Sequence, residues 1–186
     1  MESRSASGSR PETNVLAAYD SKASGLRALG AYARFRAHFN GSRRTDFSLW
    51  KISALEDPHV RALASAAARD ADVVLISLVG NVAPPEPLRL WLDLWIPRRR
   101  ASPGVLTTLL SPGFRASENG AQLKRFLQRA AALGGLDHAF GQRAMRDCAE
   151  AHFGGIRQDP AGRDPAAPHS EFRRSHHGGP HRLPAS

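Results

Sequence analysis

Polar and small side chains that could hold a ligand follow three apolar runs of the sequence. The first run ends at Tyr19, and residues 20–25 after it read Asp-Ser-Lys-Ala-Ser-Gly. Backbone amides at a helix start bind anions such as phosphate, and hydroxyl groups assist them. The carboxylate of Asp20 ends an apolar run, so it needs donors or water there and could orient a ligand hydroxyl or accept a proton. Residues 20–25 therefore predict an anion-binding loop.

Two later apolar runs end in the same way. One is followed by residues 80–82 and the other by residues 111–114. If these runs are parallel strands, their carboxyl ends share one edge of a sheet, where ligands bind in such folds. The sequence indicates no catalytic residue. The candidate ligand-binding residues are Asp20, Ser21, Ser24, Gly25, Gly80, Asn81, Val82, Ser111 and Phe114.

Each of these positions also has a purely structural explanation. Ser21 and Ser24 are typical helix-capping residues, and Asp20 could cap the same helix. The Gly80-Asn81 pair could simply supply the backbone freedom that a turn requires. Capping and turn formation therefore remain open beside ligand contact.

The elements that must position these residues alternate between short apolar runs and amphipathic segments. We predict strands at residues 14–19, 45–53, 72–79, 104–111 and 136–140, and helices at residues 21–39, 58–70, 86–96, 117–133 and 143–153. The Asp57-Pro58 pair and Ser117 are helix starts, because Asp and Ser accept from free amides and proline lacks a donor there. The connections are too long for hairpins, which predicts a parallel sheet with helices on both faces.

The predicted fold class is therefore α/β, with three layers around a doubly wound, mostly parallel, five-stranded sheet. Five strands alternating with helices fit the strand order 2-1-3-4-5, whose ligand crevice lies between strands 1 and 3. Residues 1–13 are rich in Ser and charge, and residues 154–186 are rich in Pro, Gly, His and Arg. We predict disordered tails at both ends and one folded domain over residues 14–153.

Composition excludes several classes of protein. The chain has 186 residues and one cysteine, Cys148, which excludes an intrachain disulfide and a cysteine-cluster metal site. The apolar stretch 71–79 is far shorter than the roughly 20 residues that span a bilayer, and Met1 is followed by polar residues. We therefore expect a cytoplasmic protein without a membrane or export signal.

The net charge of +9 favours anionic partners as a class. Arg43-Arg44 precede the second predicted strand and Arg98-Arg99-Arg100 precede the fourth, so both clusters would gather at the edge opposite the crevice. They could bind an acidic protein or nucleic acid. The alternative is that they are solvated cations at helix carboxyl termini, which the helix dipole favours.

Other chemistries find little support. The sequence contains no dinucleotide-binding, P-loop, zincin or nucleophile-elbow motif. Four histidines, at positions 38, 59, 138 and 152, show no ligand spacing, and a metal at His176, His177 and His181 would lack a scaffold. We predict no metal site, and we interpret Cys148 as a small packed residue.

Two segments carry a family resemblance. Residues 15–25 (VLAAYDSKASG) and 71–95 (ADVVLISLVGNVAPPEPLRLWLDLW) resemble the ligand-loop segments of flavodoxin-like proteins and related flavin reductases. The overall resemblance is to a bacterial flavodoxin-like or receiver-like α/β family. It implies Ser21, Ser24 and Gly25 near a phosphate and residues 80–82 near a ring, with FMN or another nucleotide as the cofactor.

The sequence departs from the family patterns at these same segments. Residues 20–25 lack the Thr-Gly-x-Thr pattern, and residues 80–85 carry no aromatic side chain to stack on a flavin, which leaves Phe114. Receiver chemistry fits less well, because Asp20 is a single acid and no lysine follows residues 136–140.

Three hypotheses about function follow. The leading one is a noncatalytic signalling or interaction module on a flavodoxin-like scaffold. The second is a flavin- or nucleotide-binding oxidoreductase that uses the crevice, and the third is a nucleic-acid-associated protein that uses the arginines. From the sequence we expect Asp20→Ala to leave the fold intact and to abolish binding of any crevice ligand.

Overall fold

The computed structural model describes residues 12–39, 44–80, 84–99 and 102–153. All of them lie in residues 1–155, the first of two units into which the chain divides. The predicted C-terminal tail lies outside the described residues, as do residues 1–11 of the predicted N-terminal tail.

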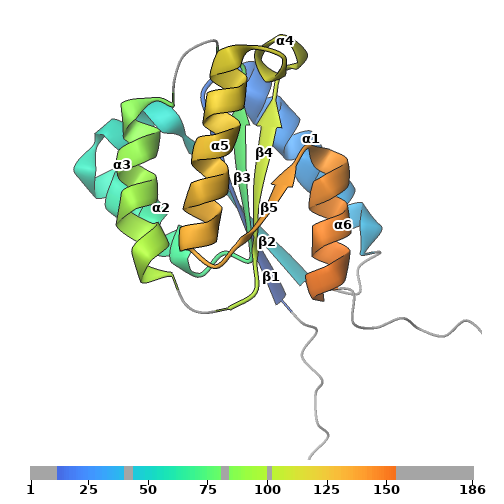
Figure 1. Cartoon of the computed structure of the whole chain (residues 1–186). Helices are drawn as coiled ribbons and strands as arrows, with labels where there is room; N and C mark the ends of the chain where they lie inside the picture. The colour runs from blue at the N-terminus through green and yellow to red at the C-terminus, as the bar shows by residue number, and fades with distance from the viewer. Residues whose placement is uncertain (1–11, 40–43, 81–83, 100–101, 154–186) are drawn as a thin grey trace, which may run out of the picture. The chain divides into compact units, whose positions relative to one another are not determined.

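Five parallel strands form one sheet in the order β2-β1-β3-β4-β5 (Figure 1). The strands are β1 (Glu12–Tyr19), β2 (Arg44–Lys51), β3 (Val73–Leu78), β4 (Val105–Leu110) and β5 (Asp137–Phe140). This order confirms the predicted doubly wound, flavodoxin-like fold class. The first strand begins two residues earlier than predicted, because Glu12 and Thr13 pair with Arg44 and Thr45.

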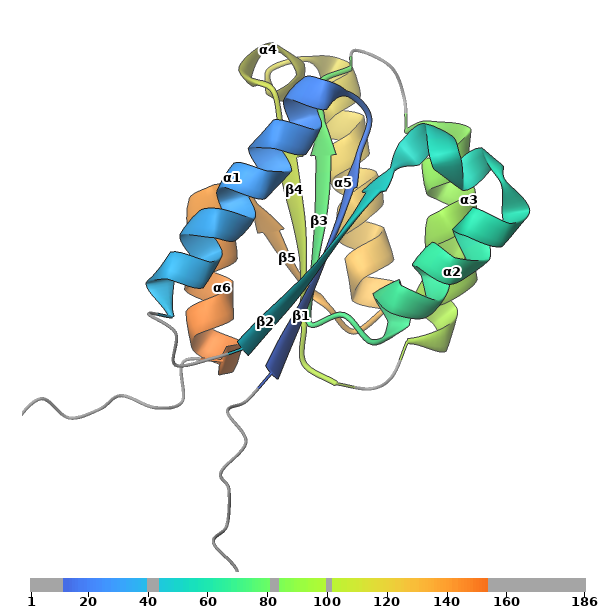
Figure 2. The ribbon, with the colours of Figure 1, turned by 180° about the vertical axis from the view of Figure 1, so that it is seen from behind.

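Helices cover both faces of the sheet, as Figures 1 and 2 show. One face carries α1 (Lys22–His38) and α6 (Gln142–Phe153). The other carries α2 (Pro58–Arg69), α3 (Glu86–Trp95) and α5 (Glu118–Leu133). Side chains of a strand alternate between faces, and so Val73 and Leu75 join one apolar core while Val74 and Ile76 join the other.

The predicted helix starts are confirmed. The Asp57 carboxylate accepts from the backbone N–H of His59 at 2.7 Å, and Pro58 is the first helical residue of α2. The Ser117 hydroxyl oxygen accepts from the N–H of Gly120 at 3.1 Å at the start of α5. These bonds satisfy amides that have no partner within the helix.

Three short helices were not predicted. They are η1 (Ile52–Glu56), η2 (Ile96–Arg98) and α4 (Pro112–Arg115). The second strand ends at Lys51 instead of residue 53, because Ile52 and Leu55 turn into the core beside α2 and α3.

The tryptophans of α3 belong to this core. Trp91 and Trp95 are fully buried, and their ring centroids lie 5.5 Å apart. This confirms the interpretation of the pair as core residues. No helix in the described part of the chain is both long and apolar enough to cross a membrane.

We predict that Leu75→Ala lowers the free energy of unfolding by about 2–5 kcal/mol, because Leu75 is fully buried in the central strand β3. Urea denaturation measures this loss. Leu63→Ala removes the same atoms from a side chain that is 51% exposed, so it should change stability little. Equal effects of the two substitutions would contradict the placement of Leu75.

Candidate functional site

Asp20 connects the ends of the two central strands β1 and β3. Its Oδ2 accepts from the N–H of Val79 at 2.9 Å and from the N–H of Gly80 at 3.1 Å. Its Oδ1 accepts from the Ser24 hydroxyl at 2.6 Å. The Asp20 carboxylate was expected to need hydrogen-bond donors. The protein itself supplies three, which are the two backbone N–H groups and the Ser24 hydroxyl.

These contacts also set the charge state of Asp20. Burial by itself raises the pKa of a carboxyl group, but hydrogen bonds from Ser24, Val79 and Gly80 outweigh burial and hold the pKa of Asp20 below its ordinary value. The group is thus a carboxylate at neutral pH. It is a poor proton acceptor, because a general base works best with a pKa near the operating pH.

The two serines form a capping box at the start of α1. The Ser21 hydroxyl accepts from the N–H of Ser24 at 3.3 Å, and the Ser24 hydroxyl accepts from the N–H of Ser21 at 2.9 Å. The carbonyl oxygen of Ser24 accepts from the Ser77 hydroxyl at 2.9 Å, which joins α1 to β3. A Cβ on Gly25 would lie 3.0 Å from the Tyr19 ring, so Gly25 lets the ring pack closely on α1.

The other predicted residues divide between this edge and the core. The Ser111 hydroxyl donates to the carbonyl of Val79 at 3.2 Å, which joins it to the segment that Asp20 holds. Phe114 is only 2% exposed and packs in the core with α3 and α5. Asn81 and Val82 lie outside the described residues. The structure thus brings Asp20, Ser21, Ser24, Gly25, Gly80 and Ser111 to one edge of the sheet and buries Phe114.

A pocket of about 360 Å³ lies at the same edge, but at the ends of β4 and β5. β5 ends at Phe140, which is level with Thr108, whereas β4 continues to Leu110, so β5 stops short of the tip of β4 (Figure 1). The pocket is lined by Arg27, Thr108, Leu109, Leu110, Pro112, Arg115, Phe140, Gly141 and Gln142.

Sequence reasoning missed the polar residues of this pocket. Arg27 is one of three arginines spaced between the apolar residues of the predicted helix 21–39, and Arg115 and Gln142 belong to no motif. The available signal was the shortness of residues 136–140, which leaves the neighbouring strand uncovered at its end.

The arginines at the opposite edge make contacts within the protein. The Arg98 guanidinium donates to the carbonyl of Leu94 at 2.8 Å, at the end of α3. Arg99 donates to the carbonyl of Ala71 at 2.9 Å. Arg44 forms an exposed ion pair with Glu12 at 3.8 Å. Arg43 and Arg100 lie outside the described residues.

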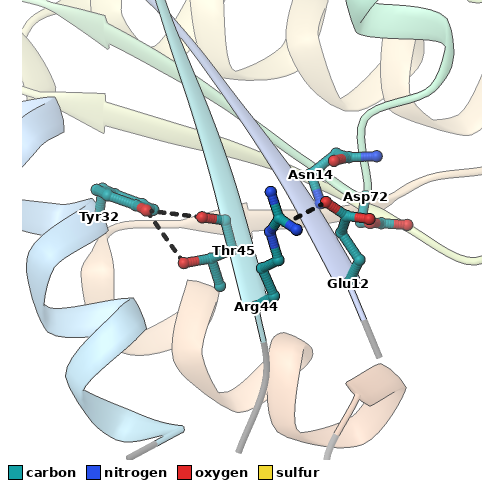
Figure 3. A network of polar contacts seen from close by, with 6 residues as sticks. All are labelled: Glu12, Asn14, Tyr32, Arg44, Thr45 and Asp72. Atoms are coloured by element: carbon teal, nitrogen blue, oxygen red, sulfur yellow. Dashed lines mark hydrogen bonds and ion pairs between the residues drawn. The ribbon is translucent and has the colours of Figure 1, made fainter. Parts of the chain in front are cut away.

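Further polar contacts tie this amino-terminal edge together (Figure 3). The Asp72 carboxylate accepts from the N–H of Asn14 at 2.8 Å, and the N–H of Asp72 donates to the carbonyl of Asn14 at 2.9 Å. The Tyr32 hydroxyl lies 3.0 Å from the Thr45 hydroxyl, so α1 is bonded to the edge strand β2. These contacts favour a structural role for the edge.

Three of the four described histidines contact separate partners, and His138 Nε2 lies 3.0 Å from the Thr108 hydroxyl. His38 Nε2 lies 2.8 Å from Glu150 Oε1, and His152 Nε2 lies 2.7 Å from Asp137 Oδ2. Among the described residues, no group of three or more His, Cys, Asp or Glu side chains could hold a metal ion. Residues 176–181, with their three histidines, lie outside the described part.

Cys148 is partly buried on α6, against the core that α1 and α6 share. Burial raises the pKa of its thiol, and the charges of Asp137 and Asp147 raise it further. A thiol with a raised pKa forms little thiolate at neutral pH. This supports the interpretation of Cys148 as a packed residue.

Comparisons with known proteins add a structural likeness, to be set beside the fold. No protein-family model matches the chain, and no curated protein matches it in sequence. Among solved structures, the chain is similar to a short-chain flavodoxin associated with a non-canonical PDU bacterial microcompartment. The identity is 12% and the TM-score 0.49, over 76% of this chain and 96% of that chain. The strand order, and not this likeness, assigns the fold.

The contacts of Asp20 change the outcome expected for its substitution. Asp20→Asn should destabilise the fold at neutral pH by about 1–3 kcal/mol, because the carboxylate is the acceptor for buried and partly buried donors. A lowered pKa in the folded state stabilises the fold above the unfolded pKa, and this contribution disappears as the pH falls through the folded pKa.

The difference in melting temperature between wild type and Asp20→Asn should therefore be largest above about pH 5 and should shrink below about pH 4. Thermal denaturation followed by circular dichroism from neutral to acid pH measures it. Asp93→Asn, on the exposed side of α3, is the matched control. A difference that stays constant with pH would refute this role of Asp20.

The arginine edge gives a second prediction. Arg99 donates to the carbonyls of Ala71 and Ser102 through different nitrogens, which a lysine cannot do. Arg99→Lys should lower the free energy of unfolding by about 1–3 kcal/mol. Arg98→Lys should change it little, because Arg98 is exposed. Urea denaturation compares the two, and a tolerated Arg99→Lys would show that its carbonyl contacts are dispensable.

Proposed function

We propose that this chain is a noncatalytic signalling or interaction module on a flavodoxin-like scaffold. One observation carries the proposal. In a doubly wound sheet of this strand order, ligands bind where the order reverses, between strands 1 and 3. Here the Asp20 carboxylate spans that position and accepts hydrogen bonds from Ser24, Val79 and Gly80.

The chemistry of the edge also argues against the oxidoreductase hypothesis. Residues 80–85 contain no aromatic side chain, and Phe114 is buried as part of the larger apolar core. A flavin ring at this edge would lack the stacking partner that the sequence analysis assigned to it. Asp20, with its lowered pKa, would serve poorly as a proton acceptor.

The arginine contacts weaken the nucleic-acid hypothesis. Phosphate binding needs guanidinium groups that are free to approach a polyanion. Arg99 is partly buried and donates to the carbonyls of Ala71 and Ser102, and Arg44 faces Glu12, whereas the exposed Arg98 makes one such bond and keeps other donors. The net charge of +9 remains, and it favours an acidic partner for an interaction module.

Native mass spectrometry of freshly purified protein, with an absorption spectrum of the same sample, tests the proposal. We expect the mass of the 20.1 kDa chain or its oligomer without a retained cofactor, and no flavin absorption. Added FMN should keep its fluorescence in the presence of micromolar protein, since a bound flavin in a stacked site is quenched. A retained flavin or nucleotide, or saturable FMN binding that Asp20→Asn abolishes, would overturn the noncatalytic assignment.

A further inference from the structure

We propose that the pocket at the ends of β4 and β5 binds a small organic phosphate monoester. The inference goes beyond the proposed function, because it concerns a different part of the sheet edge from the position that Asp20 occupies. It rests on how the pocket is formed, on the charges in its wall and on its apolar surface.

The pocket exists because β5 is short. Its last residue, Phe140, pairs with Thr108, and the N–H of Gly141 donates to the carbonyl of Thr108 at 3.0 Å. Backbone groups alternate in direction along a strand, so the N–H of Leu110 points to the same side as the carbonyl of Thr108, beyond the end of β5. The space at this side of β4 is therefore built into the sheet.

The charge of the wall is positive. Two of the nine lining residues are arginines, and none is acidic. Arg27 donates one bond to the carbonyl of Leu78 at 3.1 Å, which holds its guanidinium at the wall while other donors of the group remain. Arg115 is an exposed residue at the end of α4. Guanidinium groups bind phosphate through paired N–H donors, so this pair favours a compact dianion.

Two neighbours strengthen the positive field. The Nζ of Lys124 lies 4.8 Å from the centre of the Phe140 ring, which is itself part of the wall. Gln142 is the first residue of the twelve-residue helix α6, and Gly141 before it has a φ of 88°. The amino-terminal end of α6 thus adds the positive end of a helix dipole to the two arginines.

The remaining wall is apolar, and the pocket is small. Leu109, Leu110, Pro112 and Phe140 supply carbon surface beside the arginines. A volume of about 360 Å³ lies in the lower part of the range for small-molecule sites. These features fit a phosphate ester with a small apolar group better than they fit a bare anion or a polymer.

Amide chemical shifts in ¹⁵N-labelled full-length protein test the site, with phenyl phosphate as the probe at constant ionic strength. We expect saturable shifts at Leu109, Leu110, Arg115 and Gln142. Inorganic phosphate should move the same amides and bind more weakly, because it lacks the apolar group. Equal affinities for the two probes would contradict the organic part of the proposal, and shifts that do not saturate would contradict a site.

Variants distinguish binding of phenyl phosphate in this pocket from nonspecific attraction of the anion to a basic protein. Arg115→Ala should weaken phenyl phosphate binding about ten-fold, which is the loss expected for one charged hydrogen bond. Gln142→Glu should weaken it at least as much, because it adds a negative charge to the wall while an acid at a helix start favours folding. Arg129→Ala removes an exposed charge of α5 that is not in the wall and should leave binding unchanged.

Unchanged binding in both pocket variants, or an equal loss in Arg129→Ala, would overturn the proposal. FMN binding, measured with the same variants, tests the noncatalytic assignment separately from the pocket. FMN binding that Asp20→Asn abolishes and Arg115→Ala leaves intact would contradict the proposed function alone. Phenyl phosphate binding that Arg115→Ala weakens about ten-fold and Asp20→Asn leaves intact would support the pocket alone.

Discussion

The Asp20 carboxylate joins the segments that leave the two central strands, and the carboxyl edge of the sheet depends on this contact. β1 and β3 are neighbours in space, but Val73 comes 54 positions after Tyr19 in the sequence, so the ends of the two strands need a connection of their own. Oδ2 receives the N–H groups of Val79 and Gly80, and Oδ1 receives the Ser24 hydroxyl. Through Ser24 the same group reaches the first turn of α1, and through Val79 it reaches Ser111 after β4.

The two edges of the sheet are joined by different contacts, and each has a pocket, of about 250 Å³ beside the first residues of β1 and β2 and of about 360 Å³ at the ends of β4 and β5. At the amino-terminal edge, Asp72 is bonded to Asn14, and Arg99 donates to the carbonyl of Ala71. A Cβ on Gly104 would lie 2.9 Å from the carbonyl oxygen of Asp72, so only glycine fits this crowded position. At the carboxyl edge, hydrogen bonds join the exits of β1, β3 and β4, but the end of β5 leaves a pocket.

Much of the fold could be predicted from the sequence, because strong local signals agreed with one another. Residues 72–79 are apolar almost throughout, which is typical of a strand buried on both faces, and Asp57-Pro58 and Ser117 marked helix starts chemically. The capping serines and the need of Asp20 for donors were also visible. The identity of those donors was not, because Val79 and Gly80 lie 59 and 60 residues away from Asp20 and meet it only in the sheet. The burial of Phe114 and the pocket beside β5 could not be read from the sequence for a related reason. The direction of a ring after a strand, and the space beside a short strand, depend on neighbouring elements.

Amide hydrogen exchange at Val79 and Gly80 tests most directly whether Asp20 is a structural tie. These residues follow β3, and only the carboxylate contact protects their N–H groups at this edge of the described structure. If the N–H groups of Val79 and Gly80 are hydrogen-bonded to Asp20, both amides should exchange more slowly than those of an unstructured peptide. In Asp20→Asn both amides should exchange much faster than in the wild-type protein. Exchange at the rate of an unstructured peptide in the wild-type protein would show instead that the carboxylate is available to a ligand.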